Sequence, residues 1–420
     1  SPPAPLLGDD DGELDRSLVR LENFLGILGF CQYSFLRAAL SWIAFFVLSI
    51  ALPLVVVDLS TCVGCEKLEI ESFELEIILF RAAIAAVSLL CVSRNLRKYG
   101  IRKALFFDRT LGRATQFRKL YIQKIRVFYR FLLTWVGICL ALKSVREIYH
   151  AIYLHNGWWL STVLFLSSLL SWSYSTLVFL SGCALFHLVG NLQVIHFENY
   201  GKVLEQDLDV SAYIEEHMSL TYDLSKISHR FRIFLLLEFL IITACQFVTL
   251  LQTTQNVGII NLINAGDFAV LTITQLVGIV LCLNAAARIS HRAQSLGSVA
   301  SRWHALATCS SSSSGGNNDD GSFSGGAGNE PLPPFGLRVS YSEADLESSD
   351  FVAWPSNTQL YSTRSSYHKR QAFVTYVLSN TGGFTIFGWV VDRMLVNTIF
   401  FIELSLVFFV LGKTITVTVR

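Results

Sequence analysis

Long apolar stretches alternate with polar loops along most of this chain. A bilayer core needs about 20 apolar residues in one helix, and seven stretches come close to that length or exceed it. They are residues 36–57, 75–92, 127–145, 159–188, 233–251, 268–287 and a segment within 384–411. The pattern predicts an all-α polytopic membrane protein with seven transmembrane helices.

The composition agrees with this fold class. Hydrophobic residues make up 52% of the chain and charged residues only 15%, against about 25% charged in soluble domains. The formal net charge is +1 and no basic domain stands out, so we expect the lipid bilayer, and no nucleic acid, as partner.

The lysines and arginines between the spans predict the orientation. Residues 93–126 carry eleven of them against one acid, Asp108, whereas residues 58–74 carry five acids and one lysine. Cytoplasmic loops hold the excess of basic residues, so the 93–126 loop and the N-terminus are predicted to be cytoplasmic and the C-terminus outside. This orientation is opposite to that of G-protein-coupled receptors. The membrane is either the plasma membrane or an endomembrane.

Four regions follow from these patterns. A Ser- and Gly-rich tract at 309–334 lies in the third region, and a breaker sequence at 380–383 ends the short helix of the fourth. The predicted regions are a cytoplasmic tail with a lead-in helix (1–35), spans one to six with cytoplasmic helix extensions (36–300), a largely disordered cytoplasmic loop (301–366), and a short cytoplasmic helix followed by the last span (367–420).

The chain shows no signature of an enzyme, a cofactor or a metal site. It has no GxSxG, no HExxH and no Gly-rich phosphate loop. Cys62 and Cys65 form a lone CxxC, which leaves a local disulfide and two free thiols as alternatives. Five cysteines inside apolar runs are interpreted as small buried hydrophobes: Cys91, Cys139, Cys183, Cys245 and Cys282.

Charged residues inside the spans need partners, because each costs about 2.5–3.5 kcal/mol on insertion. Counting about 1.5 Å per residue gives Arg81 and Glu403 similar depths on the outer side. The same count gives Arg130 and Glu238 similar depths on the inner side. We therefore predict the ion pairs Arg81–Glu403 and Arg130–Glu238. Separate solvation of each charge, and a ring of Glu403 carboxylates that selects ions, are the alternatives.

Three segments of the second half carry a family resemblance. They contain HRFRIFLLLEFLIITACQFVTLLQTTQ (229–255), LCLNAAARISHRAQSLGSVASRW (within 265–309) and YHKRQAFVTYVLSNTGGFTIFGWVVDRMLVNTIFFIELSLVFFVLGKTI (367–415). Together they resemble the plant gustatory-receptor-like proteins, a plant family of unknown function that is a remote relative of insect gustatory and odorant receptors. The resemblance covers nearly all of the chain after Ser228.

The resemblance implies an insect-chemoreceptor-like homotetramer with a cytoplasmic helical anchor domain. The last span of each subunit would line one cation pore, and a small organic ligand would bind in the outer half of the helices. An ungapped comparison puts the Thr–Tyr pair of the insect proteins at Ser405 and Leu406, their Gln–Phe pair at Gly412 and Lys413, and their apolar constriction at Phe409. The implied pore-lining residues are Thr398, Ile402, Ser405, Phe409, Gly412 and Lys413.

Helix periodicity separates Glu403 from this face. Glu403 lies two residues before Ser405, about 200° away around the helix, so it is predicted to face its own bundle if Ser405 faces a pore.

Five aromatic residues cluster near the predicted outer ends of spans three and four. Either they form an interfacial belt or they line a ligand pocket. They are Trp135, Tyr149, Tyr153, Trp158 and Trp159.

The leading interpretation is therefore a ligand-gated, cation-conducting channel subunit. The size of Phe409 and the charge of Lys413 favour the alternative, a non-conducting small-molecule-binding receptor or membrane scaffold.

Overall fold

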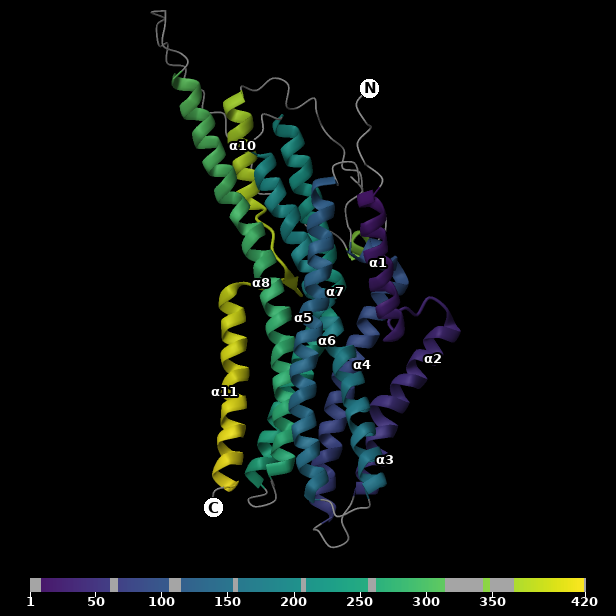
Figure 1. The fold of residues 1–420 in the computed structure, drawn as a ribbon. Helices are drawn as coiled ribbons and strands as arrows, with labels where there is room; N and C mark the ends of the chain where they lie inside the picture. The colour runs from purple at the N-terminus through teal and green to yellow at the C-terminus, as the bar shows by residue number, and fades with distance from the viewer. Residues whose placement is uncertain are drawn as a thin grey trace, which may run out of the picture. The chain divides into compact units, whose positions relative to one another are not determined.

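The computed structural model describes residues 9–60, 67–105, 115–153, 158–204, 209–255, 262–313, 343–347 and 366–418. Its elements are nearly all helical (Figure 1). The helices are α1 (Asp9–Ile27), α2 (Phe35–Phe46), the π-helix η1 (Val47–Ala51), α3 (Leu52–Ser60), α4 (Lys67–Leu105), α5 (Thr115–Tyr153), α6 (Trp158–Val203), α7 (Val210–Gln255), α8 (Leu262–Ser313), α9 (Glu343–Glu347), α10 (Ser366–Ser379) and α11 (Arg393–Thr418).

Six helical segments are long and apolar enough to cross a membrane, so the chain is an integral membrane protein with an all-α framework. They are Phe35–Leu59, Glu74–Ile101, Lys119–Ile148, Trp159–Val203, Val210–Leu251 and Gly266–Cys309. Each contains one of the first six predicted spans. The final helix α11 is not among them in the described part of the chain, so the seventh span stays a prediction.

The chain divides into two compact units. One unit consists of Ser1–Leu192, Arg230–Ala285 and Arg393–Arg420, and the other of Gln193–His229 and Ala286–Asp392. Helices α6, α7 and α8 have 46, 46 and 52 residues, whereas a bilayer needs about 20. Each of these helices therefore contributes a segment to both units.

Helix α8 extends beyond its predicted end. It continues to Ser313, so the first residues of the predicted 301–366 loop are helical.

The first span of the larger unit is interrupted by a turn of π-helix. The turn η1 precedes Pro53, which lacks the backbone N–H that a regular helix would use. Ser49, within this turn, is fully buried. Its hydroxyl accepts a hydrogen bond from the Ser175 hydroxyl of α6 (3.1 Å). The local irregularity therefore places a polar contact between two membrane helices.

Helices α4 and α6 approach each other closely at Gly182. The Ser88 hydroxyl of α4 donates to the Val178 carbonyl oxygen of α6 (3.0 Å). A Cβ atom at residue 182 would lie 2.0 Å from that hydroxyl oxygen. Glycine is therefore required where these two helices cross, as small residues often are between membrane helices.

The smaller unit has an aromatic core. Tyr200 and Tyr213 are fully buried, and the Tyr200 hydroxyl donates to the Tyr213 carbonyl oxygen (2.9 Å). The Tyr213 and Phe373 rings are 5.9 Å apart, and Trp303 meets both edge-on at 5.6 and 5.9 Å. These contacts hold α10 against α7 and α8 within this unit.

A short hairpin separates α10 from α11. Helix α10 ends at the predicted breaker, where Gly382 has a positive φ of 65°. Strands β1 (Thr385–Ile386) and β2 (Trp389–Val390) then pair antiparallel around Phe387 and Gly388, both at positive φ, as a two-residue hairpin turn requires. The apolar run that begins at residue 384 is therefore not helical throughout, because the helix begins only at Arg393.

Candidate functional site

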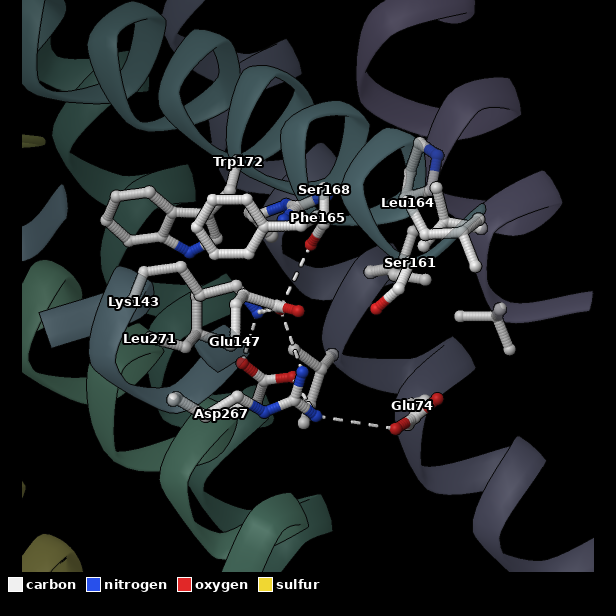
Figure 2. Close-up of a pocket in the computed structure, with 17 residues that line it drawn as sticks. Glu74, Lys143, Glu147, Ser161, Leu164, Phe165, Ser168, Trp172, Asp267 and Leu271 are labelled. Atoms are coloured by element: carbon white, nitrogen blue, oxygen red, sulfur yellow. Dashed lines mark hydrogen bonds and ion pairs between the residues drawn. The ribbon is translucent and has the colours of Figure 1, made fainter. Parts of the chain in front are cut away.

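A cavity in the larger unit is lined by five helical elements. Its wall comes from α3, α4, α5, α6 and α8, and most of its lining side chains are labelled in Figure 2. The lining residues are Pro53, Val56, Val57, Glu74, Ile77, Ile78, Arg81, Lys143, Arg146, Glu147, Ser161, Leu164, Phe165, Ser168, Trp172, Asp267 and Leu271. Among these are six ionisable side chains, an unusual concentration for a bundle of apolar helices.

Two of the bases lie on α5 with an acid of the same helix. Lys143 and Glu147 are four residues apart and therefore share a helix face. The Lys143 ammonium contacts the Glu147 carboxylate at 2.7 Å and also donates to Asp267 of α8. Lys143 and Glu147 are only 5% and 7% exposed. The lysine thus joins α5 to α8 by a buried ion pair.

Arg146 extends this network to α4. Its guanidinium contacts Glu147 at 2.8 Å, Asp267 at 2.7 Å and Glu74 at 3.5 Å. The planar guanidinium offers five N–H donors in a fixed geometry, which suits several carboxylates at once. Three acids and two bases therefore join α4, α5 and α8, with one negative charge in excess.

Arg81 is the third base that lines the cavity, and among the described residues it contacts no carboxylate. Its guanidinium donates to the Ser171 hydroxyl (3.1 Å). The residue is only 9% exposed, and its Nε is buried without a hydrogen-bond partner among the described residues. An unsatisfied buried donor costs about 1–3 kcal/mol. Arg81 can therefore receive an anion that enters the cavity.

The rest of the wall is apolar and aromatic. Figure 2 shows Trp172 and Phe165 across the Lys143–Glu147 pair from Asp267. The Ser168 hydroxyl donates to Glu147 at 3.0 Å. The cavity volume is about 80 Å³, which is room for a few water molecules or a small polar group, since one water needs roughly 10–15 Å³ by this measure. The site suits a small ligand with an anionic group and an apolar body.

Both predicted ion pairs are wrong. Arg81 contacts Ser171 instead of Glu403, and Glu403 accepts a hydrogen bond from the Thr243 hydroxyl of α7 (2.6 Å). Arg130 is exposed. Glu238 is buried with two cysteine thiols as its partners. Similar residue counts along the spans therefore did not make these residues partners, because Arg81 contacts α6 and Glu403 contacts α7.

The two members of the predicted aromatic cluster whose side chains the structure describes, Trp135 and Trp159, do not line this cavity. Trp159 is 81% exposed, and the Trp135 ring packs beside Phe131, with 6.1 Å between centroids. The side chains of Tyr149, Tyr153 and Trp158 lie outside the described residues. Among the described residues the aromatic lining comes from Phe165 and Trp172, about two and four turns further along α6 than Trp159.

The face of α11 that was predicted to line a pore is exposed within the chain. Ile402 and Phe409 are each 53% exposed, and Thr398, Ser405 and Gly412 are exposed as well. The Lys413 side chain is outside the described residues. Glu403, only 3% exposed, lies on the opposite side of the helix against its own bundle.

None of the five residues of the charged network was singled out from the sequence: Glu74, Lys143, Arg146, Glu147 and Asp267. A signal for them exists, because all five lie near the ends of predicted spans that meet on one side of the membrane. The i, i+4 spacing of Lys143 and Glu147 is a further hint. Neither feature indicates which helices are neighbours.

Comparison with known proteins gives a family. Residues 16–402 match the family described as "Protein of unknown function (DUF3537)". The chain belongs to the DUF3537 family. No curated protein matches it. The DUF3537 match spans all six candidate membrane helices and the cavity. Since the family description names no activity, a function for this DUF3537 protein has to be argued from the geometry.

Proposed function

We propose that this DUF3537 protein is the subunit of a homotetrameric, ligand-gated cation channel whose pore is lined by α11. One observation carries the proposal. Helix α11 turns its only deep carboxylate, Glu403, into its own bundle and leaves the face with Ile402, Ser405 and Phe409 uncovered. Such a face is available to other copies of the same helix.

The resemblance to plant gustatory-receptor-like proteins supports the same assembly. It adds a seventh span at α11, a cytoplasmic N-terminus and an anchor domain built from cytoplasmic helix ends. Phe409 would then form the narrowest ring of the pore, since an apolar constriction can gate a channel by dewetting. The protein would lie in the plasma membrane or an endomembrane.

The position of α11 can be tested with spin labels at Ser405→Cys in the full-length protein. Among the described thiols Cys309 is exposed, so it is first replaced by serine. We expect two short label–label distances in the ratio of the side of a square to its diagonal, because four copies of Ser405 would surround one axis.

Dilution with unlabelled chains is the control, and it should remove the dipolar signal. An absence of dipolar coupling in the undiluted sample would mean that Ser405 faces lipid on isolated chains. The proposal would then be abandoned.

The second candidate is a receptor that binds a small molecule without conducting. The cavity favours it, because Arg81 offers buried guanidinium donors beside the apolar wall of Trp172 and Phe165. In either candidate this cavity is the ligand site, and the ligand carries a carboxylate or a similar anionic group. The bulk of Phe409 in all four subunits would keep the axis closed.

Acetate and its neutral analogue acetamide are small enough to probe this site. We expect the purified protein to bind acetate at least about tenfold more tightly than acetamide, because a charge-assisted hydrogen bond contributes about 1.5–3 kcal/mol. Calorimetric titration measures both affinities. In Arg81→Gln the preference should disappear, whereas the matched variant Arg94→Gln, exposed on the same helix, should retain it. Equal affinities in the unmodified protein would contradict the assignment.

A further inference from the structure

Two thiols and one carboxylate from three different helices meet inside the larger unit. Cys183 belongs to α6, Glu238 to α7 and Cys282 to α8. The Cys183 sulfur is 3.1 Å from Glu238 Oε1, and the Cys282 sulfur is 3.6 Å from Glu238 Oε2. One ligand atom from each residue lies within 4.8 Å of the other two. The carboxylate is thus held between two sulfur atoms.

Among the residues that the structure describes, no base forms an ion pair with this carboxylate. Glu238 is 2% exposed, and the cysteines are 0% and 1% exposed. Among the described residues the two thiols are the only hydrogen-bond partners of Glu238. Buried charges are normally paired or bound to a metal. A carboxylate in these surroundings is therefore suited to bind a cation.

The backbone is adapted to the position of the carboxylate. A Cβ atom at Gly278 of α8 would lie 3.2 Å from Glu238 Oε1 and 2.3 Å from the Phe179 ring. A larger residue would push the Phe179 ring or the carboxylate out of place. The absence of a side chain at Gly278 therefore leaves room for the Glu238 carboxylate beside the two sulfurs.

We propose that Cys183, Glu238 and Cys282 bind a zinc ion. Zinc accepts thiolate and carboxylate ligands together, whereas magnesium and calcium prefer oxygen alone. Bonds of about 2.3 Å to sulfur and 2.1 Å to oxygen at tetrahedral angles separate two ligand atoms by roughly 3.6–3.8 Å. The two sulfur–oxygen distances of the cluster, 3.1 and 3.6 Å, are close to the lower of these values, so small side-chain rotations bring three of the four ligands of a tetrahedral zinc site into place.

Binding requires proton release, because the metal ligand is the thiolate. Each thiol that coordinates the ion gives its proton to the solvent, so zinc affinity rises with pH. The bound ion would link α6, α7 and α8 at one point. The site is independent of α11 and of the charged cavity, so it does not depend on either proposed function.

Metal analysis of the purified full-length protein tests the site. The protein carries an affinity tag without histidine, is dialysed against a chelator, and is then titrated with Zn²⁺. We expect one tightly bound ion per chain. In Cys183→Ser/Cys282→Ser the affinity should fall about a hundredfold or more, since even outer partners of a metal site account for 10–100-fold. Cys245→Ser, which removes another buried thiol from α7, should bind like the unmodified protein.

Co²⁺ provides a readout that needs no variant. In the unmodified protein it should give the intense sulfur-to-metal charge-transfer bands of thiolate coordination. Absence of these bands, no zinc retained by the unmodified protein, or equal retention by the double variant would each overturn the assignment. An intramolecular disulfide between Cys183 and Cys282 in the protein purified under reducing conditions would do the same.

Discussion

Replacing Lys143 by methionine should lower the free energy of unfolding by about 3–5 kcal/mol, because it removes one partner of a buried ion pair. Glu147 and Asp267 would lose one of the two cations that they share, and the three acids would then have Arg146 as the single base of the network. Thermal unfolding of the purified protein in detergent, followed by circular dichroism, measures the effect as a large fall in the midpoint temperature.

The matched control is Arg292→Met, which breaks an ion pair with Glu198 at 2.9 Å whose side chains are 51% and 44% exposed. Exposed pairs contribute about 0–1 kcal/mol, so its midpoint should stay close to that of the unmodified protein. Lys143→Met/Asp267→Leu also removes one of the two acids that Lys143 contacts, and should recover part of the loss because the network then carries one negative charge fewer. Similar midpoints for Lys143→Met and Arg292→Met would show that the network does not stabilise the fold.

The membrane helices were predictable because a bilayer imposes length and polarity on each segment separately. The first span illustrates this: the run 36–57 lies within the segment Phe35–Leu59. The contact made by the π-turn at Val47–Ala51 was not predictable, because it joins Ser49 to Ser175, which are 126 residues apart.

The charged cavity could not be predicted, because its residues come from five elements with no local motif. Arg81 and Glu403 show the limit of the sequence-based reasoning. Counting residues gives the height of a side chain in the bilayer, but the direction in which it points depends on helix rotation and on the neighbouring helix. Arg81 turns toward Ser171 of α6 and Glu403 toward Thr243 of α7.

Helix periodicity succeeded where the question concerned a single helix. Residues on α11 that are three and four apart share one face, and Glu403 and Val407 are both buried on the other. The same reasoning could not find the Cys183–Glu238–Cys282 cluster. In the sequence its members are two cysteines within apolar stretches and one isolated acid. Only the packing of three helices brings them together.

Replacing Phe409 by alanine should strongly increase cation flux if α11 lines a pore. Four phenyl rings would narrow the axis, and their removal would widen and wet the constriction. Phe408→Ala is the matched control. Phe408 has the same ring and is 65% exposed against 53% for Phe409, but it lies about 100° away around the helix.

Cation flux into liposomes that contain the full-length protein is the decisive measurement for the proposed channel. We expect measurable flux for the unmodified protein, several-fold higher flux for Phe409→Ala, and little change for Phe408→Ala. Absence of flux from all three folded proteins, or an equal increase in both variants, would contradict a pore lined by α11.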